Sequence, residues 1–332
     1  MYKFSIILPV RNGGEYVKTC VNSILSQTEQ DFNLIVLDNC STDGTREWLA
    51  SLQNKKIIIY PADRPLTIEE NWARAIDVPK NEFITLIGHD DILHPDYLSV
   101  INNLINQHPA AGLYQTHFNF IDEKGDIIRP CAGMQNTIKP EEFIQYTLLN
   151  KIEVTGTGFM IRSAEYDKIG GIPPYPNLLY ADIEMVLQLI GNSYLAVAPD
   201  TTFEFRFHIN NTSKSGGEKR LAAFERLIAY LKKVEIENEV YRDIIQKNVS
   251  TFLHSYVIGS CHKLIYIPEK KREGITMDRI IEVAKKAAQT LSPVISFFPE
   301  KNKSIVLAKL VDSNPVTRAF FLFYKSFKQR TF

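Results

Sequence analysis

The sequence predicts an α/β protein, with a mainly parallel sheet flanked by helices and a helical C-terminal region. Short apolar runs alternate with amphipathic segments in the N-terminal third, a pattern typical of the strand–helix units that build parallel sheets. The apolar runs end in polar residues, as expected where such a sheet binds ligands. From Glu218 onward the apolar residues recur at helical spacing.

Each element follows from its own stretch of sequence. The apolar runs that predict strands are Phe4–Val10, Phe32–Asp38, Lys56–Tyr60, Glu82–Ile87 and Ala111–Phe120. The helices expected between and after them are Glu15–Gln27, Asp43–Leu52, Thr67–Ile76, Pro95–Gln107 and Leu179–Ile190. Further helices are expected over Leu221–Val234, Tyr241–Leu264 and Met277–Leu291. We therefore expect one domain in residues 1–215 and a helical region in residues 216–332.

The composition excludes several classes of protein. With 332 residues, 45% of them hydrophobic, the chain can bury a sizeable core. Its 38 Lys and Arg balance 38 Asp and Glu, which argues against a nucleic-acid-binding protein. The four cysteines form no Cys-x-x-Cys pair, so we expect free thiols in a reducing cytoplasm. We expect neither a membrane-spanning helix nor a signal peptide, because long apolar runs and a small-residue cleavage site are absent.

Polar side chains follow three predicted strands, at Pro9–Asn12, Asp38–Ser41 and His89–Asp91. The carboxyl ends of parallel strands meet at one edge of a sheet, where ligands bind. Ser41–Asp43 can cap the next helix, whereas Asp38 precedes this cap and could either bind a ligand or serve the fold. Neither Gly-x-Gly-x-x-Gly nor Gly-x-x-x-x-Gly-Lys-[Ser/Thr] occurs, so a nucleotide bound here needs another counter-charge for its phosphates.

Asp90 and Asp91 are adjacent carboxylates at the end of an apolar strand. Their like charges resist burial, so solvent, a helix N-terminus or a cation has to compensate them. Mg²⁺ or Mn²⁺ takes one or two carboxylates from a protein and completes its shell with substrate phosphates. The alternative is that the pair only favours the N-terminus of the helix near Pro95.

Several ordered motifs resemble those of inverting family 2 glycosyltransferases with the GT-A fold. Residues 5–45 hold a strand ending in Pro-x-x-Asn, a helix with Ser-x-x-x-Gln, and a strand ending in Asp before Ser-Thr-Asp-Gly-Thr. Residues 69–98 are similar to the segment with that family's metal-binding Asp-x-Asp motif, and residues 156–189 to its acceptor region and catalytic Glu-Asp motif. The likeness ends near residues 205–215. It implies a GT-A-like, Rossmann-like domain in residues 1–215 that binds a nucleotide sugar and carries the catalytic site.

The resemblance also implies roles for individual residues. Those that would line the nucleotide pocket are Pro9, Arg11, Asp38, Asn39, Arg74 and Asp90, with Asp38 facing the base. Those that would approach the metal are Asp90, Asp91 and His208. Asp182 would be the catalytic base, although its position equally suits a partner for a helix N-terminus. Thr155, Gly156 and Thr157 would approach the acceptor, or form a plain turn. Trp72 and Tyr180 could stack on sugar or base, or belong to the core.

Two positions depart from the family's motifs. Gly88 replaces the first aspartate of Asp-x-Asp, so His89 could contribute to coordination. Ala181 replaces the glutamate of Glu-Asp and leaves Asp182 as the carboxylate of that motif. Glu184 does not replace it, because residues two apart on a helix point in different directions.

The implied reaction transfers a sugar, with inversion, from a UDP- or dTDP-sugar to a hydroxyl of a glycan or a lipid-linked acceptor. Asp182 would accept the proton of that hydroxyl. A divalent metal, Mn²⁺ or Mg²⁺, would be the cofactor. Bacterial surface-polysaccharide assembly is the setting that the resemblance implies.

The C-terminal tail, residues 316–332, is aromatic and basic and contains no acidic residue. This composition fits a peripheral contact with the inner face of a membrane, or a helix that packs on the domain or on another subunit of a homo-oligomer. Two other functions stay open: a degenerate protein that binds a nucleotide sugar without turnover, which Gly88 and Ala181 favour, and a helical scaffold in residues 218–332. A sugar-nucleotide pyrophosphorylase is disfavoured, because PVRNGGEY lacks the pattern of its Gly-rich basic loop.

Overall fold

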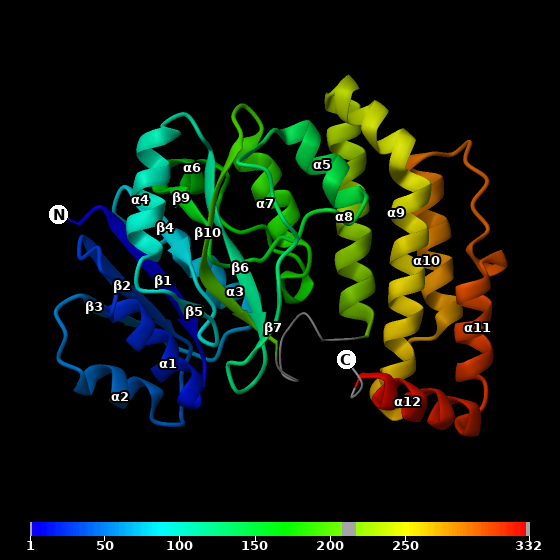
Figure 1. Cartoon of the computed structure of the whole chain (residues 1–332), viewed down its shortest axis with the longest axis horizontal. Helices are drawn as coiled ribbons and strands as arrows, with labels where there is room; N and C mark the ends of the chain where they lie inside the picture. The colour runs from blue at the N-terminus through cyan, green and yellow to red at the C-terminus, as the bar shows by residue number, and fades with distance from the viewer. Residues whose placement is uncertain (1, 208–216, 330–332) are drawn as a thin grey trace. The chain divides into compact units, whose positions relative to one another are not determined.

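The computed structural model describes residues 2–207 and 217–329. The chain divides into two compact units (Figure 1). The first consists of residues 1–147 and 151–214, and the second of residues 148–150 and 215–332.

Within the described residues, the first unit is built on one ten-stranded sheet. Its strands are β1 (Phe4–Val10), β2 (Phe32–Asp38), β3 (Ile57–Pro61), β4 (Phe83–Leu86), β5 (Ile92–Leu93), β6 (Leu113–Ile121), β7 (Ile127–Pro130), β8 (Thr137–Ile138), β9 (Met160–Arg162) and β10 (Leu195–Arg206). Their order is β3-β2-β1-β4-β9-β6-β10-β5, with β7 on β6 and β8 on β10.

The predicted α/β class is confirmed, and one half of the sheet is entirely parallel. There β3, β2, β1 and β4 pair in parallel, which brings the ends of β1, β2 and β4 to the same edge. In the other half, β6 and β10 are parallel, while β9 lies antiparallel between β4 and β6. Strands β5, β7 and β8 add further antiparallel pairs. The sheet is therefore mixed beyond β4, where short strands gave no clear sequence signal.

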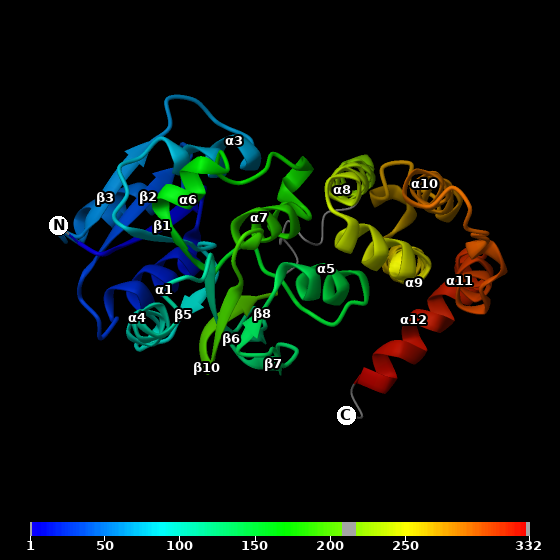
Figure 2. The ribbon, with the colours of Figure 1, turned by 90° about the horizontal axis from the view of Figure 1, so that it is seen from above.

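The helices of the first unit cover both faces of the sheet. They are α1 (Gly14–Leu25), α2 (Thr45–Ser51), α3 (Ile68–Ala73), α4 (Tyr97–Gln107), α5 (Pro140–Leu148), α6 (Ser163–Lys168) and α7 (Ala181–Ile190), with 3-10 turns η1 (Arg74–Ile76) and η2 (Pro176–Leu178). Helices α1 and α4 lie on one side of β1 and β2, and α3 and α6 on the other (Figure 2).

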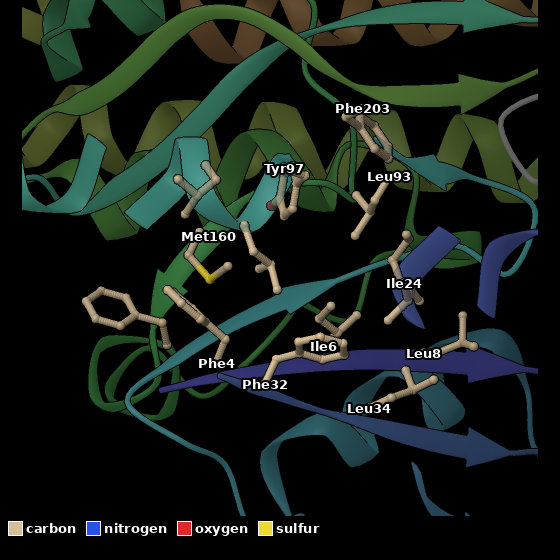
Figure 3. Packing of buried hydrophobic residues seen from close by; sticks show 14 of the residues in the cluster. Phe4, Ile6, Leu8, Ile24, Phe32, Leu34, Leu93, Tyr97, Met160 and Phe203 are labelled. Carbon is tan, nitrogen blue, oxygen red and sulfur yellow. The ribbon is translucent and has the colours of Figure 1, made fainter. Parts of the chain in front are cut away.

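The main core lies between α1, α4 and the sheet. Alternate residues of β1, namely Phe4, Ile6 and Leu8, point to this side and are fully buried. Ile24 of α1 and Tyr97 of α4 pack against them (Figure 3). Because burial of each such side chain contributes roughly 1.5–3 kcal/mol, this layer holds the strands, and hence their carboxyl ends, in place.

The second unit is helical, as predicted. Its helices are α8 (Glu218–Glu237), α9 (Glu239–Tyr266), α10 (Met277–Leu291), α11 (Lys303–Asp312) and α12 (Pro315–Gln329), with 3-10 turns η4 (Glu269–Lys271) and η5 (Pro299–Lys301). Phe224 of α8 stacks on Tyr256 of α9, with ring centroids 3.5 Å apart and an interplanar angle of 5°. Helix α12 comprises most of the aromatic tail. None of the described helices combines the length and the apolar character needed to cross a bilayer.

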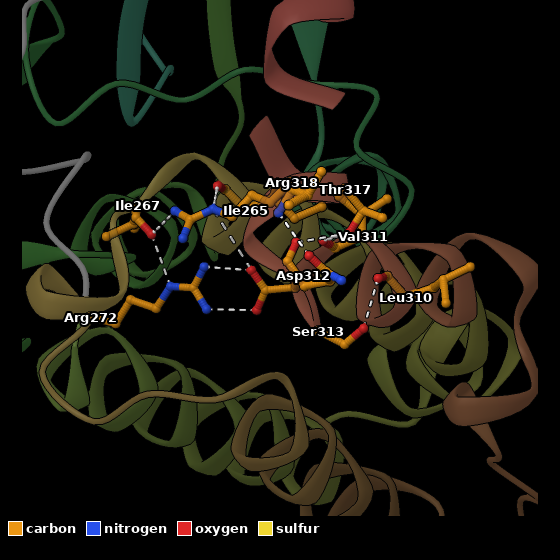
Figure 4. A network of polar contacts seen from close by, with 11 residues as sticks. Ile265, Ile267, Arg272, Leu310, Val311, Asp312, Ser313, Thr317 and Arg318 are labelled. Atoms are coloured by element: carbon orange, nitrogen blue, oxygen red, sulfur yellow. Dashed lines mark hydrogen bonds and ion pairs between the residues drawn. The ribbon is translucent and has the colours of Figure 1, made fainter. Parts of the chain in front are cut away.

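A polar network fixes α11 and α12 to the end of α9 (Figure 4). The guanidinium of Arg272 donates two hydrogen bonds of 2.6 Å to the carboxylate of Asp312, and its Nε donates to the carbonyl of Ile267. Arg318 of α12 donates to the carbonyls of Ile265 and Ile267. The pair Arg272–Asp312 is largely buried, so it forms a geometrically specific link rather than a surface ion pair.

Candidate functional site

A cavity of about 500 Å³ lies at the shared edge where β1, β2 and β4 end. Pro9, Val10 and Arg11 line it from β1, Asn39 from the end of β2, and residues 88–91 from the loop after β4. The size is typical of small-molecule sites. The edge predicted from the polar strand ends is thus where the cavity is found.

Asn39 fixes one wall of the cavity. Its Nδ2 donates to the carbonyl of Leu66 at 2.9 Å, and its Oδ1 accepts from the amide of Leu66 at 2.8 Å. The loop after β3 is thereby held over the end of β2, so that Leu66, Ile68 and Trp72 face the cavity.

Asp38 and Arg74 are placed differently from the other residues expected in the nucleotide pocket. Among the described residues, neither lines the cavity. Asp38 is buried, and its Oδ1 accepts from the amide of Ser41 at 3.3 Å. Arg74 donates to the carbonyls of Asp38 and Tyr60, at 3.3 and 2.7 Å. In this geometry the side chain of Arg74 holds the ends of β2 and β3 together, whereas that of Asp38 fixes the turn after β2.

Asp90 and Asp91 occupy different environments, although both line the cavity. Asp90 is half-buried, whereas Asp91 is 2% exposed. Oδ2 of Asp91 accepts from the hydroxyl of Thr157 at 2.8 Å, and Oδ1 accepts from the amide of Arg206 at 3.0 Å. Burial, reinforced by the neighbouring charge of Asp90, raises the pKa of Asp91 well above its usual value.

Asp182 lines the same cavity at the start of α7. Its Oδ1 accepts from the amide of Ile183 at 3.0 Å, which favours the ionised form, but burial outweighs this and raises the pKa of Asp182 to about 6. The helix begins two residues later than predicted, because Leu178 and Tyr180 adopt left-handed backbone conformations with φ of 56° and 67°. Such strain in non-glycine residues is typical of functional loops.

Glu184 is committed to other partners. Its Oε2 accepts from the hydroxyl of Tyr175 at 2.6 Å, and its Oε1 accepts from Nε2 of Gln188 at 3.1 Å. Glu184 therefore serves the packing of α7, and that it does not replace Asp182 as a base stays a prediction.

The opposite walls of the cavity are joined directly. The amide of Asn177, in η2, donates to Oε1 of Glu69, in α3, at 2.6 Å. Helix α3 contributes Ile68 and Trp72 to the lining, and the segment after Asn177 contributes Leu178, Leu179 and Tyr180. One hydrogen bond thus links the two apolar walls.

Thr155, Gly156 and Thr157 also line the cavity. The hydroxyl of Thr155 donates to the carbonyl of Thr157 at 2.8 Å, and that of Thr157 donates to Asp91. Both hydroxyls therefore donate within the protein.

Comparison with known proteins identifies the family of this chain. The model of the family "Glycosyl transferase family 2" matches residues 5–170, which is half of the chain.

The chain belongs to glycosyltransferase family 2.

Curated relatives include the glycosyltransferase GlyG of Streptococcus pneumoniae, which is 25% identical over 149 residues, covering 44% of this chain and 49% of the relative. An uncharacterized glycosyltransferase of Rickettsia conorii is 30% identical over 152 residues, covering 44% and 23%. The chain thus spans half or less of these two relatives.

Among solved structures, residues 1–349 of TarS from S. aureus in complex with UDP-GlcNAc superpose with a TM-score of 0.66, at 16% identity, covering 87% of this chain and 81% of that one. The mannosyltransferase PcManGT from Pyrobaculum calidifontis, in complex with GDP-Man and Mn²⁺, gives a TM-score of 0.51 at 13% identity, covering 96% and 82%. These likenesses establish the predicted GT-A fold.

The two departures from the family's motifs have structural reasons in this family 2 member. A Cβ atom at Gly88 would lie 2.7 Å from Oδ1 of Asp90 and 2.9 Å from Oδ2 of Asp91, so both carboxylates fold back over a residue without a side chain. Ala181 is fully buried. A carboxylate at either position would have to displace its neighbours.

The acidic pair fits a divalent ion that the protein coordinates only in part. Among the described residues, no three His, Cys, Asp or Glu side chains come together as a metal site. Asp90 and Asp91 nevertheless place two like-charged carboxyl groups at the cavity, where burial and the neighbouring charge of Asp90 raise the pKa of Asp91. A hard cation held by one or two carboxylates and by phosphate oxygens would offset them. His208, also expected near the metal, lies outside the described residues.

Sequence reasoning missed several lining residues, among them Leu66, Ile68, Asn71, Ile172 and Phe205. They are ordinary apolar or amide side chains in loops, in the short helix α3 and, for Phe205, in strand β10. No local pattern distinguishes them from core residues, since only the tertiary fold turns them toward the cavity.

Proposed function

We propose that this family 2 protein is an inverting glycosyltransferase that moves a sugar from a nucleoside-diphosphate sugar to a hydroxyl of a glycan or lipid-linked acceptor. The observation that carries the proposal is the position of Asp182. A carboxylate with a pKa of about 6 lies in the same cavity as Asn39 and Asp90, which end the strands that would hold a nucleotide.

In this proposal Asp182 is the general base. A base whose pKa lies near the working pH is ionised and still accepts a proton readily. Asp182 would take the proton of the acceptor hydroxyl as that oxygen attacks the sugar carbon opposite the leaving diphosphate. Trp72 and Tyr180, which also line the cavity, would hold the sugar faces and exclude water.

Asp90, with Asp91 beside it, would hold the divalent metal, Mn²⁺ or Mg²⁺. When bound, the ion would stabilise the negative charge of the departing diphosphate. Pro9, Arg11 and Asn39 would contact the nucleotide, and Thr155–Thr157, which also line the cavity, the acceptor.

UDP- and dTDP-sugars are the proposed donors. TarS of S. aureus was solved with UDP-GlcNAc and PcManGT with GDP-Man, so the base has to be settled by binding experiments. Residues 1–215 would form the catalytic domain and residues 216–332 a region for acceptor, oligomer or membrane contacts.

A cytoplasmic protein with a peripheral membrane contact through residues 316–332 fits a lipid-linked acceptor. Helix α12 exposes Val316, Phe320 and Phe323 to more than two thirds, as expected of a segment that rests on a lipid surface. A homo-oligomer that covers the same side chains is the alternative.

A second candidate function is a degenerate protein that binds a nucleotide sugar without turnover, which Gly88 and Ala181 favour. The experiment that tests both is a thermal-shift panel of UDP, dTDP, GDP and CDP, each with and without Mn²⁺. A hundredfold excess over the dissociation constant stabilises a protein by about 2.7 kcal/mol, which is readily measured.

A Mn²⁺-dependent shift with one base, lost in Asp90→Ala, would support the site and name the donor class. Sugar transfer or donor hydrolysis by the wild-type protein would then separate the transferase from the degenerate binder. No shift with any diphosphate would refute the nucleotide site.

A further inference from the structure

Arg206, the last residue of β10, contacts both Asp90 and Asp91, and a backbone group of one partner takes part in each contact. Its side chain is buried, with a residue exposure of 3%. Its Nε donates to the carbonyl oxygen of Asp90 at 2.8 Å, and its backbone amide donates to the carboxylate of Asp91 at 3.0 Å. The family's motifs imply no role for this residue, although the likeness ends in its segment, residues 205–215.

The same guanidinium joins two further segments to the loop after β4. Its Nη1 donates to the carbonyls of Asp122 and Glu123, at 2.8 and 3.3 Å, in the turn between β6 and β7. It also lies over the ring of Tyr16, in α1, at 5.0 Å from the ring centroid. Three parts of the chain, distant in sequence, therefore meet on one buried side chain.

This arrangement fixes the backbone rather than neutralising the acid. The rigid fork of a guanidinium sets the direction of each carbonyl that it binds. Because the Asp90 carbonyl is held from one side and the Asp91 carboxylate from another, the peptide between them has little freedom. The direction in which the Asp90 side chain leaves the backbone follows from that peptide.

We infer that Arg206 is a positioning residue: it holds the backbone of Asp90 so that the Asp90 carboxylate meets a divalent ion bound together with a nucleoside diphosphate. This inference rests on the proposed function. Residues that orient a metal ligand from behind affect metal affinity by roughly 10–100-fold when they are changed.

The test is a Mn²⁺ titration, read as melting temperature, in the presence of the nucleoside diphosphate that stabilises the wild type. In Arg206→Lys the ammonium cannot reproduce the fork of donors, so we expect the Mn²⁺ midpoint to rise about tenfold or more. The kcat at saturating Mn²⁺ should fall much less than the midpoint rises, since Asp182 is untouched.

Arg162→Lys is the matched control. Arg162 also donates to a backbone carbonyl, that of Pro109 at 2.8 Å, and also lies over an aromatic ring, that of Phe83 at 4.7 Å. It does not line the cavity. Its replacement should lower the melting temperature of the free protein without moving the Mn²⁺ midpoint.

Equal midpoints in Arg206→Lys and Arg162→Lys would overturn the inference and reduce Arg206 to a structural role. If Arg206→Lys does not fold, Tyr16→Ala and Tyr16→Phe replace it, because only the first removes the ring beneath the guanidinium. A raised midpoint in Tyr16→Ala alone supports the inference, and equal midpoints overturn it. A wild type that shows no Mn²⁺-dependent shift with any of the four diphosphates overturns the proposed function, and this inference with it.

Discussion

The hydroxyl of Thr157 donates a hydrogen bond of 2.8 Å to Oδ2 of Asp91, and the two residues are 66 positions apart in the sequence. The bond is buried and joins the segment before β9 to the loop after β4. Two segments distant in the sequence are thus joined by a polar contact between residues that line the cavity.

Replacing Thr157 with valine should destabilise the protein. The substitution keeps the shape of the side chain but leaves an oxygen of the buried Asp91 without its donor, at a cost of roughly 1–3 kcal/mol. Urea unfolding of Thr157→Val and of Thr157→Ser, which keeps the hydroxyl, measures the effect. A loss of stability in Thr157→Ser, with none in Thr157→Val, would show that the methyl group, and not the hydrogen bond, matters.

Asp182→Asn should abolish most of the turnover and leave donor binding intact. An amide cannot accept the acceptor's proton, and loss of a general base lowers kcat by roughly 10²–10⁴-fold. Steady-state kinetics and diphosphate binding measured on the same preparation separate the two effects. Glu184→Gln is the control, since the carboxylate of Glu184 binds Tyr175 and Gln188 instead. Comparable losses of kcat in both variants would contradict the assignment of the base.

The pH dependence should follow Asp182. With its pKa near 6, the ionised base is lost as the pH falls, so kcat/KM should decrease about tenfold per unit below pH 6 and level off above it.

The effect of the same group on stability has the opposite sign. Folding raises the pKa of Asp182, so ionisation costs more in the folded state and destabilises the protein once the pH exceeds the unfolded pKa. Above pH 6, Asp182→Asn should therefore melt at a higher temperature than the wild type, and at pH 4 this difference should shrink.

For the rate profile, a decrease of kcat/KM centred near pH 4 instead of pH 6 would contradict the raised pKa of Asp182.

Restoring the family's first aspartate should not improve the protein. In Gly88→Asp the new Cβ would lie within 3 Å of both neighbouring carboxylates, and a third negative charge would be added. We expect weaker Mn²⁺-dependent binding of the diphosphate than in the wild type. Gly88→Ala, which adds the Cβ without the charge, shows how much of the loss is steric. Tighter Mn²⁺ binding in Gly88→Asp would refute this account of the glycine.

In the helical unit, Arg272→Met should be strongly destabilising. It removes the hydrogen-bonded partner of the largely buried Asp312 and leaves the more distant Arg318, at 4.0 Å, as its cationic partner; breaking such a buried pair costs up to roughly 3–5 kcal/mol. Lys286→Met, which removes an exposed partner of Glu225, should cost less than about 1 kcal/mol. Chemical unfolding followed by circular dichroism compares the two. Similar losses would mean that the network in Figure 4 contributes no more than a surface ion pair.

The sequence was sufficient to predict elements with a strong pattern of apolar residues. The apolar run Phe4–Val10 and the amphipathic stretch Met277–Leu291 match the observed elements to the residue, because burial dictates their pattern. Strands β5, β8 and β9, with two or three residues each, are too short to show any period. Their pairing depends on neighbours that come from distant parts of the chain.

The cavity was predictable in part for a similar reason. The polar residues that follow the predicted strands predict Asn39 and Asp90, because polar residues after a buried strand indicate the edge where a parallel sheet binds ligands. The sequence does not show that Arg74 and Arg206 bind backbone, because an arginine near a strand end or in a short helix can also bind a ligand. The folded structure shows that each donates to backbone carbonyls, and which carbonyls these are.

The hydrogen bond between Glu69 and Asn177 has a consequence for engineering. Helix α3 and the loop of η2 are built from separate stretches of sequence, yet a hydrogen bond joins them and both line the cavity. A chimera that takes only one of these stretches from a relative would combine one replaced wall with one original wall, and the hydrogen bond between Glu69 and Asn177 would join residues of different origin. Donor or acceptor preference would therefore be transferable only when both stretches are exchanged together, as a single module.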